Sequence, residues 1–221
     1  MGKLIVIEGL DGSGKSTQLD ILCEKLKNDG VNIRRVSFPD YDSDSSALVK
    51  MYLGGKFGSS PGDVNPFAAS LFYAVDRYAS YKTDWGKFYN DGGVIISGRY
   101  TTSNAIHQTS KMDEKDWGHF TDWLYNLEYE KVGIPKPDLV IFLDMPIEVS
   151  QKLLKNRYGG DDNKKDIHES DVEYLGKCRK AAKFAAEIGN FKVINCATSD
   201  MNARSIEDIS KEIFKTVKEV L

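Results

Sequence analysis

The segment Gly9 to Ser16 contains the residue types, in the right spacing, that bind a nucleotide phosphate. Its sequence, GLDGSGKS, fits the pattern GxxxxGK[ST]. An apolar run, Leu4 to Ile7, precedes it and a segment of helical period follows it, as the pattern requires. The glycines let backbone N–H groups turn inward around phosphate oxygens, and the N-terminus of the next helix adds a favourable dipole. A chance glycine-rich turn is the alternative, and the strand and helix flanks favour the phosphate site.

In a loop of this kind the lysine reaches the β- and γ-phosphates of ATP, and the hydroxyl after it binds Mg²⁺. Here those residues are Lys15 and Ser16. ATPases, GTPases and kinases share such a loop, so the loop alone does not predict a reaction. The predicted contacts to ATP are Gly9, Asp11, Gly12, Ser13, Gly14, Lys15, Ser16 and Thr17.

Residues 97–108, SGRYTTSNAIHQ, form a second group of polar side chains that directly follows another apolar run. Arg99 at a strand end can bind a phosphate through two N–H groups, and Asn104 can pair with donor and acceptor atoms of a base. Tyr73 and Arg77 are four residues apart in a helical pattern, so they share a face. These chemistries suit an acceptor site, although Tyr73 is also typical of a core and Arg77 of a charged surface.

These side chains need elements that hold them together, and the hydropathy pattern predicts alternating strands and helices. One helix follows the loop with Leu19, Leu22 and Leu26 on one face, and another starts at Asn65-Pro66, a good cap and first-turn pair. Such alternation favours a parallel sheet covered on both faces, with ligands beyond the carboxyl ends of the strands. The predicted strands are Leu4 to Ile7, Asn32 to Phe38, Val94 to Ser97, Leu139 to Asp144 and Lys192 to Asn195.

Length and composition limit the classes of protein. A chain of 221 residues suits one domain, and 30 Lys and Arg against 33 Asp and Glu give a net charge of −3, which argues against a broad nucleic-acid-binding surface. The scattered Cys23, Cys178 and Cys196 suggest neither a disulfide framework nor a zinc site and favour the reducing cytoplasm. The N-terminal apolar run is too short for a signal segment or a membrane span.

Six segments, in this order, resemble the signature of the thymidylate kinases: IEGLDGSGKST, SFPDY, LFYAVDRY, ISGRYTTSNAIHQ, PDLVIFLD and KKDIHE. The resemblance spans most of the chain. It implies an α/β fold of the P-loop NTPase class, a three-layer sandwich in which helices flank a five-stranded parallel sheet, with residues 1–221 as a single domain and a mobile lid at about 157–168. It also implies Mg²⁺-dependent transfer of the γ-phosphate of ATP to dTMP, giving dTDP and ADP, by a homodimer.

The resemblance further implies a role for each residue of the acceptor site. Asp11 holds the 3′-hydroxyl of the sugar, Tyr73 stacks near the thymine, and Arg77 contacts the base and phosphate edges. Arg99 binds the phosphate of dTMP, and Asn104 reads N3 of thymine. The other predicted dTMP contacts close the pocket or lie along the nucleotide: Phe38, Pro39, Tyr41, Ser103, His107 and Gln108.

One departure from the family pattern lies in the loop. Many members have an arginine where this chain has Gly12, and others supply that arginine from the lid. We therefore expect Arg157, with Lys164 or Lys165, to bind ATP and neutralise the transferred phosphate, although an ammonium replaces a planar guanidinium imperfectly. A solvated charged loop is the alternative. Together with Lys15 and Arg99, these are the predicted catalytic cations.

A second departure is Gly98, where the family usually has an aspartate that helps to organise magnesium and the neighbouring arginine. Glu8 or Asp144, at neighbouring strand ends, is a candidate replacement, and Glu8 is equally well interpreted as a structural carboxylate.

Two other functions compete. A deoxynucleoside kinase shares this fold and needs a carboxylate base, for which Glu8 is available, whereas Arg99 favours a phosphorylated acceptor. A nucleotide-responsive binding module without turnover is supported by Gly98 and by a lid with few arginines.

Overall fold

Five parallel strands form the centre of the protein, which we describe from a computed structural model covering residues 1–58, 60–157 and 172–221. The strand order is β2-β3-β1-β4-β5. All neighbouring strands pair in parallel, for example with Ile7 of β1 opposite Gly98 of β3 and Ile141 of β4. The strand bounds are β1 Lys3–Gly9, β2 Ile33–Ser37, β3 Val94–Gly98, β4 Leu139–Asp144 and β5 Lys192–Asn195.

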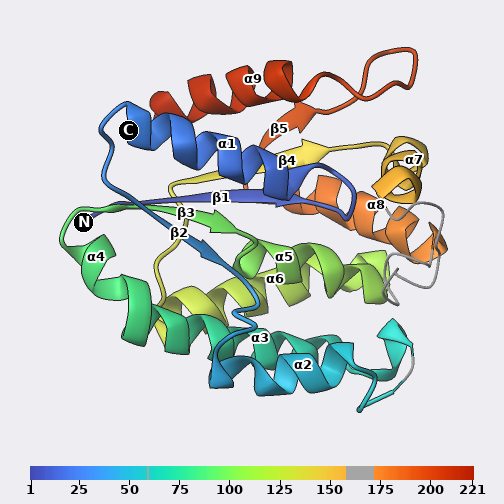
Figure 1. Ribbon diagram of the computed structural model, residues 1–221. Coiled ribbons are helices and arrows are strands. Elements are labelled where there is room, and N and C mark those ends of the chain that lie inside the picture. The colour runs from blue at the N-terminus through green and yellow to red at the C-terminus, as the bar shows by residue number, and fades with distance from the viewer. Residues whose placement is uncertain (59, 158–171) are drawn as a thin grey trace.

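Helices cover both faces of the sheet, because strands such as β1 bury side chains on each side. Leu4 and Val6 pack into one core, while Ile5 and Ile7 pack into the other. Figure 1 shows α1 and α9 on one face and α5, α6 and α8 on the opposite one. These helices span α1 Lys15–Asn28, α5 Thr101–His107, α6 Trp117–Tyr125, α8 Val172–Ile188 and α9 Ile206–Lys218.

A further helical layer lies beyond α5, where α2 packs against α3 (Figure 1). The helical run that starts at α3 continues through a π-helical turn into α4, and a second π-helical turn follows α6. The bounds are α2 Ala47–Leu53, α3 Pro66–Ser80, α4 Gly86–Asn90, α7 Ile147–Arg157, and π turns Tyr81–Trp85 and Asn126–Val132; short 3₁₀ turns cover Asp44–Ser46, Pro61–Asp63, Thr109–Lys111 and Glu114–Asp116.

The predicted elements are confirmed. Every predicted strand is present, and Leu19, Leu22 and Leu26 are buried on one face of α1. The Asn65 side chain accepts a hydrogen bond from Phe67 N at 2.8 Å and caps α3. The fold is the predicted α/β sandwich, so the carboxyl ends of β1 and β3 place residues after Ile7 and Ser97 at one edge of the sheet.

In the parts of the chain that the structure describes, we find no helix both long enough and apolar enough to pass through a bilayer.

Candidate active site

The loop after β1 wraps around the N-terminus of α1. Gly12 and Gly14 have φ angles of 76° and 82°, in the left-handed region that glycine adopts without strain. The Lys15 ammonium donates a hydrogen bond to the carbonyl of Gly9 at 3.2 Å. Helix α1 has neither a side-chain cap nor an acidic residue in its first turn, so nothing on the loop competes with an anion for its N-terminal N–H groups.

A cavity opens at this helix N-terminus, and most of the predicted ATP contacts line it. Gly9 is the exception within the loop, since its carbonyl faces Lys15 instead. Sequence reasoning missed the apolar wall formed by α7 and α9, and it also missed Arg204, which lies beside that wall. The lining residues are Leu10, Asp11, Gly12, Ser13, Gly14, Lys15, Ser16, Thr17, Gln18, Met145, Leu153, Leu154, Ala203, Arg204, Ile206 and Ile209.

Helix α7 lies directly on Gly12. A Cβ built at Gly12 would meet the carbonyl oxygen of Ser150 and Cγ of Leu154, both at 3.0 Å. Together with the positive φ, this contact strains any side chain at this position and requires α7 to shift by a few tenths of an ångström. Glycine is therefore the residue that suits this packing of α7 on the loop.

The turn after β3 aims Arg99 at the loop. Arg99 has a φ of 65°, which is uncommon for a side-chain-bearing residue and often marks a functional site. Its Nη2 lies 2.6 Å from Oδ1 of Asp11, forming an ion pair. Its Nη1 lies 2.9 Å from Nε2 of His107, which must accept because a guanidinium only donates. Arg99 thus links the loop to α5.

A second cavity lies beside this arginine and is lined by all of the predicted acceptor residues. Leu53 and Tyr100 were missed, Leu53 because its leucine side chain carries no polar signal and Tyr100 because it is fully buried in the core. Asp11 lines both cavities, so the two meet at the loop. The lining residues are Asp11, Phe38, Pro39, Tyr41, Leu53, Tyr73, Arg77, Arg99, Tyr100, Ser103, Asn104, His107 and Gln108.

Asp76 holds together two walls of the cavity that the predicted acceptor residues line. It is fully buried, and its carboxylate accepts hydrogen bonds from Asp40 N at 2.9 Å and from the Ser45 hydroxyl at 2.7 Å. The segment after β2, which carries Phe38 and Tyr41, is therefore fixed to α3. Arg77, the neighbour of Asp76, is buried as well, so Arg77 does not belong to a charged surface, the alternative raised from the sequence.

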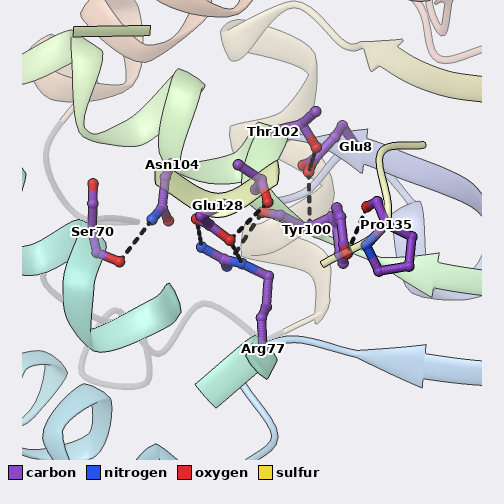
Figure 2. A network of polar contacts seen from close by, with 9 residues as sticks. Glu8, Ser70, Arg77, Tyr100, Thr102, Asn104, Glu128 and Pro135 are labelled. Carbon is purple, nitrogen blue, oxygen red and sulfur yellow. Dashed lines mark hydrogen bonds and ion pairs between the residues drawn. The ribbon is translucent and has the colours of Figure 1, made fainter. Parts of the chain in front are cut away.

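Glu8 is a structural carboxylate. It is fully buried, and one oxygen accepts hydrogen bonds from Tyr100 N at 3.1 Å and the Thr102 hydroxyl at 2.6 Å (Figure 2). The other oxygen accepts from the Ser103 hydroxyl at 2.8 Å. With both oxygens engaged at the start of α5, Glu8 is poorly placed to act as a base or as a magnesium ligand.

Asp144 is also engaged, because Arg179 of α8 donates to its two oxygens at 2.8 and 3.1 Å. Neither candidate replacement for the aspartate missing at Gly98 is therefore available in this arrangement. A Cβ at Gly98 would point toward α1, 2.7 Å from Cδ1 of Leu19, a flexible side-chain end. The position therefore faces the helix that carries Ser16.

Surrounding charges and burial set the protonation of Lys15. Burial, helped by nearby Arg99 and opposed by Asp11 and Glu8, lowers the pKa of Lys15 to about 8. A bound polyphosphate would supply negative charge at this point and favour the ammonium form.

The predicted lid cations Lys164 and Lys165 lie outside the described residues, and the Arg157 side chain does too, although its backbone ends α7. Among the described residues, no group of three or more His, Cys, Asp or Glu side chains is arranged to hold a metal ion. The Ser16 hydroxyl lines the cavity at the N-terminus of α1, at an exposed position. This setting suits an ion held mainly by phosphate oxygens and water.

Comparison with known proteins agrees with the fold and identifies the family. The profile of the family described as thymidylate kinase matches residues 7–213. A probable thymidylate kinase of Thermococcus onnurineus is 30% identical over 220 residues, covering 98% of each chain. Probable thymidylate kinase 1 of Saccharolobus solfataricus is 30% identical, covering 97% of this chain and all of the relative. The solved structure of a Candida albicans thymidylate kinase superimposes with a TM-score of 0.72 at 23% identity, covering 99% of this chain and 92% of that one.

Proposed function

Because the chain belongs to the thymidylate kinase family, we propose that the cavity at the N-terminus of α1, the donor cavity, holds ATP and that the cavity beside Arg99, the acceptor cavity, holds dTMP. The two nucleotides would meet at the phosphate-binding loop, where Asp11 lines both cavities. The chain is a nucleoside monophosphate kinase that phosphorylates dTMP, with ATP as the donor in the reaction general to kinases. The observation that carries the proposed arrangement is the contact of Asp11 with both cavities, beside an arginine that reaches it from β3.

Transfer to a monophosphate needs no general base. The second pKa of a phosphate monoester is about 6, so the acceptor oxygen is already mostly deprotonated at neutral pH. The site must then align the two phosphates and neutralise the charge that develops on the transferred group. This fits a site in which Glu8 is engaged by α5 and in which Lys15 and Arg99 converge on the loop.

On the donor side, the loop N–H groups and Lys15 would hold the phosphates of ATP, and the apolar wall of α7 and α9 would cover the nucleoside. Ser16 would contribute its hydroxyl to Mg²⁺, and the bound ion neutralises charge on the β- and γ-phosphates. Arg157, Lys164 and Lys165 remain the proposed lid cations. The packing of α7 on Gly12 supports the lid as the source of the cation, because an arginine on the loop would be strained at this position.

On the acceptor side, Arg99 would exchange part of its pairing with Asp11 for the phosphate of dTMP, which frees the carboxylate to accept from the 3′-hydroxyl of the sugar. Tyr73 would pack near the thymine, and Asn104 would pair with N3. The other lining residues, Phe38, Pro39, Tyr41, Ser103, His107 and Gln108, would enclose the nucleotide.

Separate assays with dTMP, dUMP, dCMP, UMP and thymidine, each with ATP and Mg²⁺, test the proposed substrate. We expect diphosphate from dTMP, with kcat/KM at least about tenfold above that for dCMP, since a site built around base hydrogen bonds rejects a base that lacks them. We expect a similar margin over dUMP and UMP, whose uracil makes the same hydrogen bonds but lacks the thymine methyl group. Monophosphate formed from thymidine would instead identify a deoxynucleoside kinase. Binding of ATP and dTMP without any turnover would identify a binding module.

We also propose that α2 and α3 form a homodimer interface, in line with the family resemblance. Large apolar side chains are exposed along α3 at Leu71, Val75 and Tyr78, spaced four and three residues apart on one stripe. The neighbouring α2 exposes Leu48 and Met51. Two packed helices that each expose apolar side chains suit an isologous contact with a second copy.

Val75→Arg tests this interface. Because Val75 is 54% exposed in the monomer, the variant chain should fold normally. We expect dimer dissociation to become at least about tenfold easier, equivalent to 1.4 kcal/mol, since a charge would be buried between the copies. Analytical ultracentrifugation across a dilution series measures this shift. Ile188→Arg, at a site 47% exposed at the end of α8, is the control and should leave the dimer intact. A wild-type chain that is monomeric throughout contradicts the proposal.

A further inference from the structure

Glu128 is a charged residue completely buried next to the acceptor cavity. It lies in the π-helical turn Asn126–Val132 after α6, and its side chain has no solvent exposure. Burying a carboxylate is costly unless it is paired and hydrogen-bonded. π-Helical turns are rare and often occur at functional sites. No sequence signal singled out this glutamate, so its contacts decide what it does.

The main partner of Glu128 is the guanidinium of Arg77, which is itself buried. Nε of Arg77 donates to Oε2 at 2.6 Å and Nη2 donates to Oε1 at 2.5 Å, a side-on pairing with two parallel bonds (Figure 2). This pairing fixes the plane of the guanidinium. Its third nitrogen, Nη1, lies 3.5 Å from the carbonyl oxygen of Tyr100. Because Arg77 also lines the acceptor cavity, Glu128 determines which edge of the guanidinium a nucleotide base can meet.

Glu128 also connects this arginine to α5. The Thr101 hydroxyl donates to Oε2 at 2.9 Å, the same oxygen that accepts from Nε of Arg77. Thr101 is the first residue of α5, and that helix carries Asn104 into the cavity. The Asn104 amide in turn donates to the carbonyl of Ser70 on α3 at 3.4 Å (Figure 2). One carboxylate therefore sets the distance between the two helices that bear base-directed side chains.

We propose that Glu128 is a positioning residue for base selection, which holds Arg77 so that donor groups face the base of the acceptor. This inference rests on the proposed function, in which that base is thymine. Thymine presents a carbonyl oxygen at position 4, whereas cytosine presents an amino group there. A guanidinium carries only donors, so a fixed donor edge favours thymine over cytosine. If Arg77 is held less firmly, the preference decreases while the phosphate chemistry at the loop stays intact.

Glu128→Asp is the informative change. It keeps the negative charge that compensates buried Arg77, but the side chain is one methylene shorter and cannot reach Arg77 and Thr101 in the same arrangement. We expect the ratio of dCMP to dTMP dissociation constants, measured by calorimetry, to fall by about tenfold, because a hydrogen bond to a charged donor is lost or misaligned. The KM for dTMP should rise, while the KM for ATP and kcat at saturating dTMP should change less than about threefold.

Glu130→Asp, at an exposed position in the same π turn, is the matched control and should match wild type in every measurement. A folded Glu128→Asp protein with the wild-type ratio would overturn the proposal, as would an equal loss of affinity for dTMP and dCMP. If Glu128→Asp does not fold, Thr101→Val is the second variant, because it removes one donor to the carboxylate and leaves the charge pair intact. The ratio of dCMP to dTMP dissociation constants should then fall by about threefold, and an unchanged ratio overturns the proposal. A wild-type chain that binds dTMP no better than dCMP contradicts the proposed substrate instead.

Discussion

Lys15→Ala is expected to lower kcat by about a thousandfold, equivalent to about 4 kcal/mol of transition-state stabilisation. Lys15 is the described cation that follows the loop glycines, and it lines the donor cavity at the N-terminus of α1. Its charge is placed before the reaction begins, so alanine cannot be compensated by rearranged water. Steady-state kinetics with dTMP and ATP measure the loss. Lys27→Ala, on an exposed part of the same helix, is the control, and a loss at Lys15 below about tenfold would contradict the assignment.

The same lysine should make ATP binding depend on pH. Burial lowers the pKa of Lys15 to about 8, so above pH 8 the ligand-free enzyme loses the ammonium charge that phosphate requires. Bound phosphate favours the charged form and raises this pKa, so ATP binding takes up a proton and its affinity falls as pH rises from 7 to 9. Calorimetry in two buffers of different ionisation enthalpy counts the proton. Lys15→Ala should abolish this uptake, whereas Lys27→Ala should retain it.

The sheet and the residues that line the acceptor cavity could be predicted from the sequence for one physical reason. The central strands of a parallel sheet are buried on both faces and therefore largely apolar, so Leu4 to Ile7 and Leu139 to Asp144 stand out, and their carboxyl ends lie at a common edge. Residues that follow those ends, such as Asp11 and Arg99, are then brought together by topology. The helix pattern did the same for Tyr73 and Arg77, which share one face of α3.

Contacts made by residues that belong to no motif could not be predicted from the sequence. Leu53 reaches the acceptor cavity from α2, and Arg204 reaches the donor cavity from the loop after β5, through packing that no local pattern encodes. Glu8 gave a polar signal at a strand end, but only its three hydrogen bonds show that it supports α5. Glu128 is the extreme case, because its partner lies 51 residues away along the chain.

Arg99→Lys is expected to lower kcat/KM for dTMP by about a hundredfold, equivalent to 2.7 kcal/mol. Arg99 contacts Asp11 through Nη2 and His107 through Nη1, so its planar fork spans the gap between the loop and α5. Lysine keeps the charge but presents one flexible ammonium, which cannot hold both partners or bind a phosphate through two parallel bonds. Geometry rather than charge is therefore what the substitution removes.

The pattern of loss identifies which substrate Arg99 serves. Because its side chain lines the acceptor cavity and not the donor cavity, the dissociation constant for ATP alone should stay within about threefold of wild type, while dTMP binding weakens by about tenfold or more. Arg34→Lys, at an exposed pair with Asp84 on the edge strand, is the matched control and should leave both unchanged. If ATP binding weakens as much as dTMP binding, Arg99 acts on the donor as well. That result would contradict the assignment of one cavity to ATP and the other to dTMP.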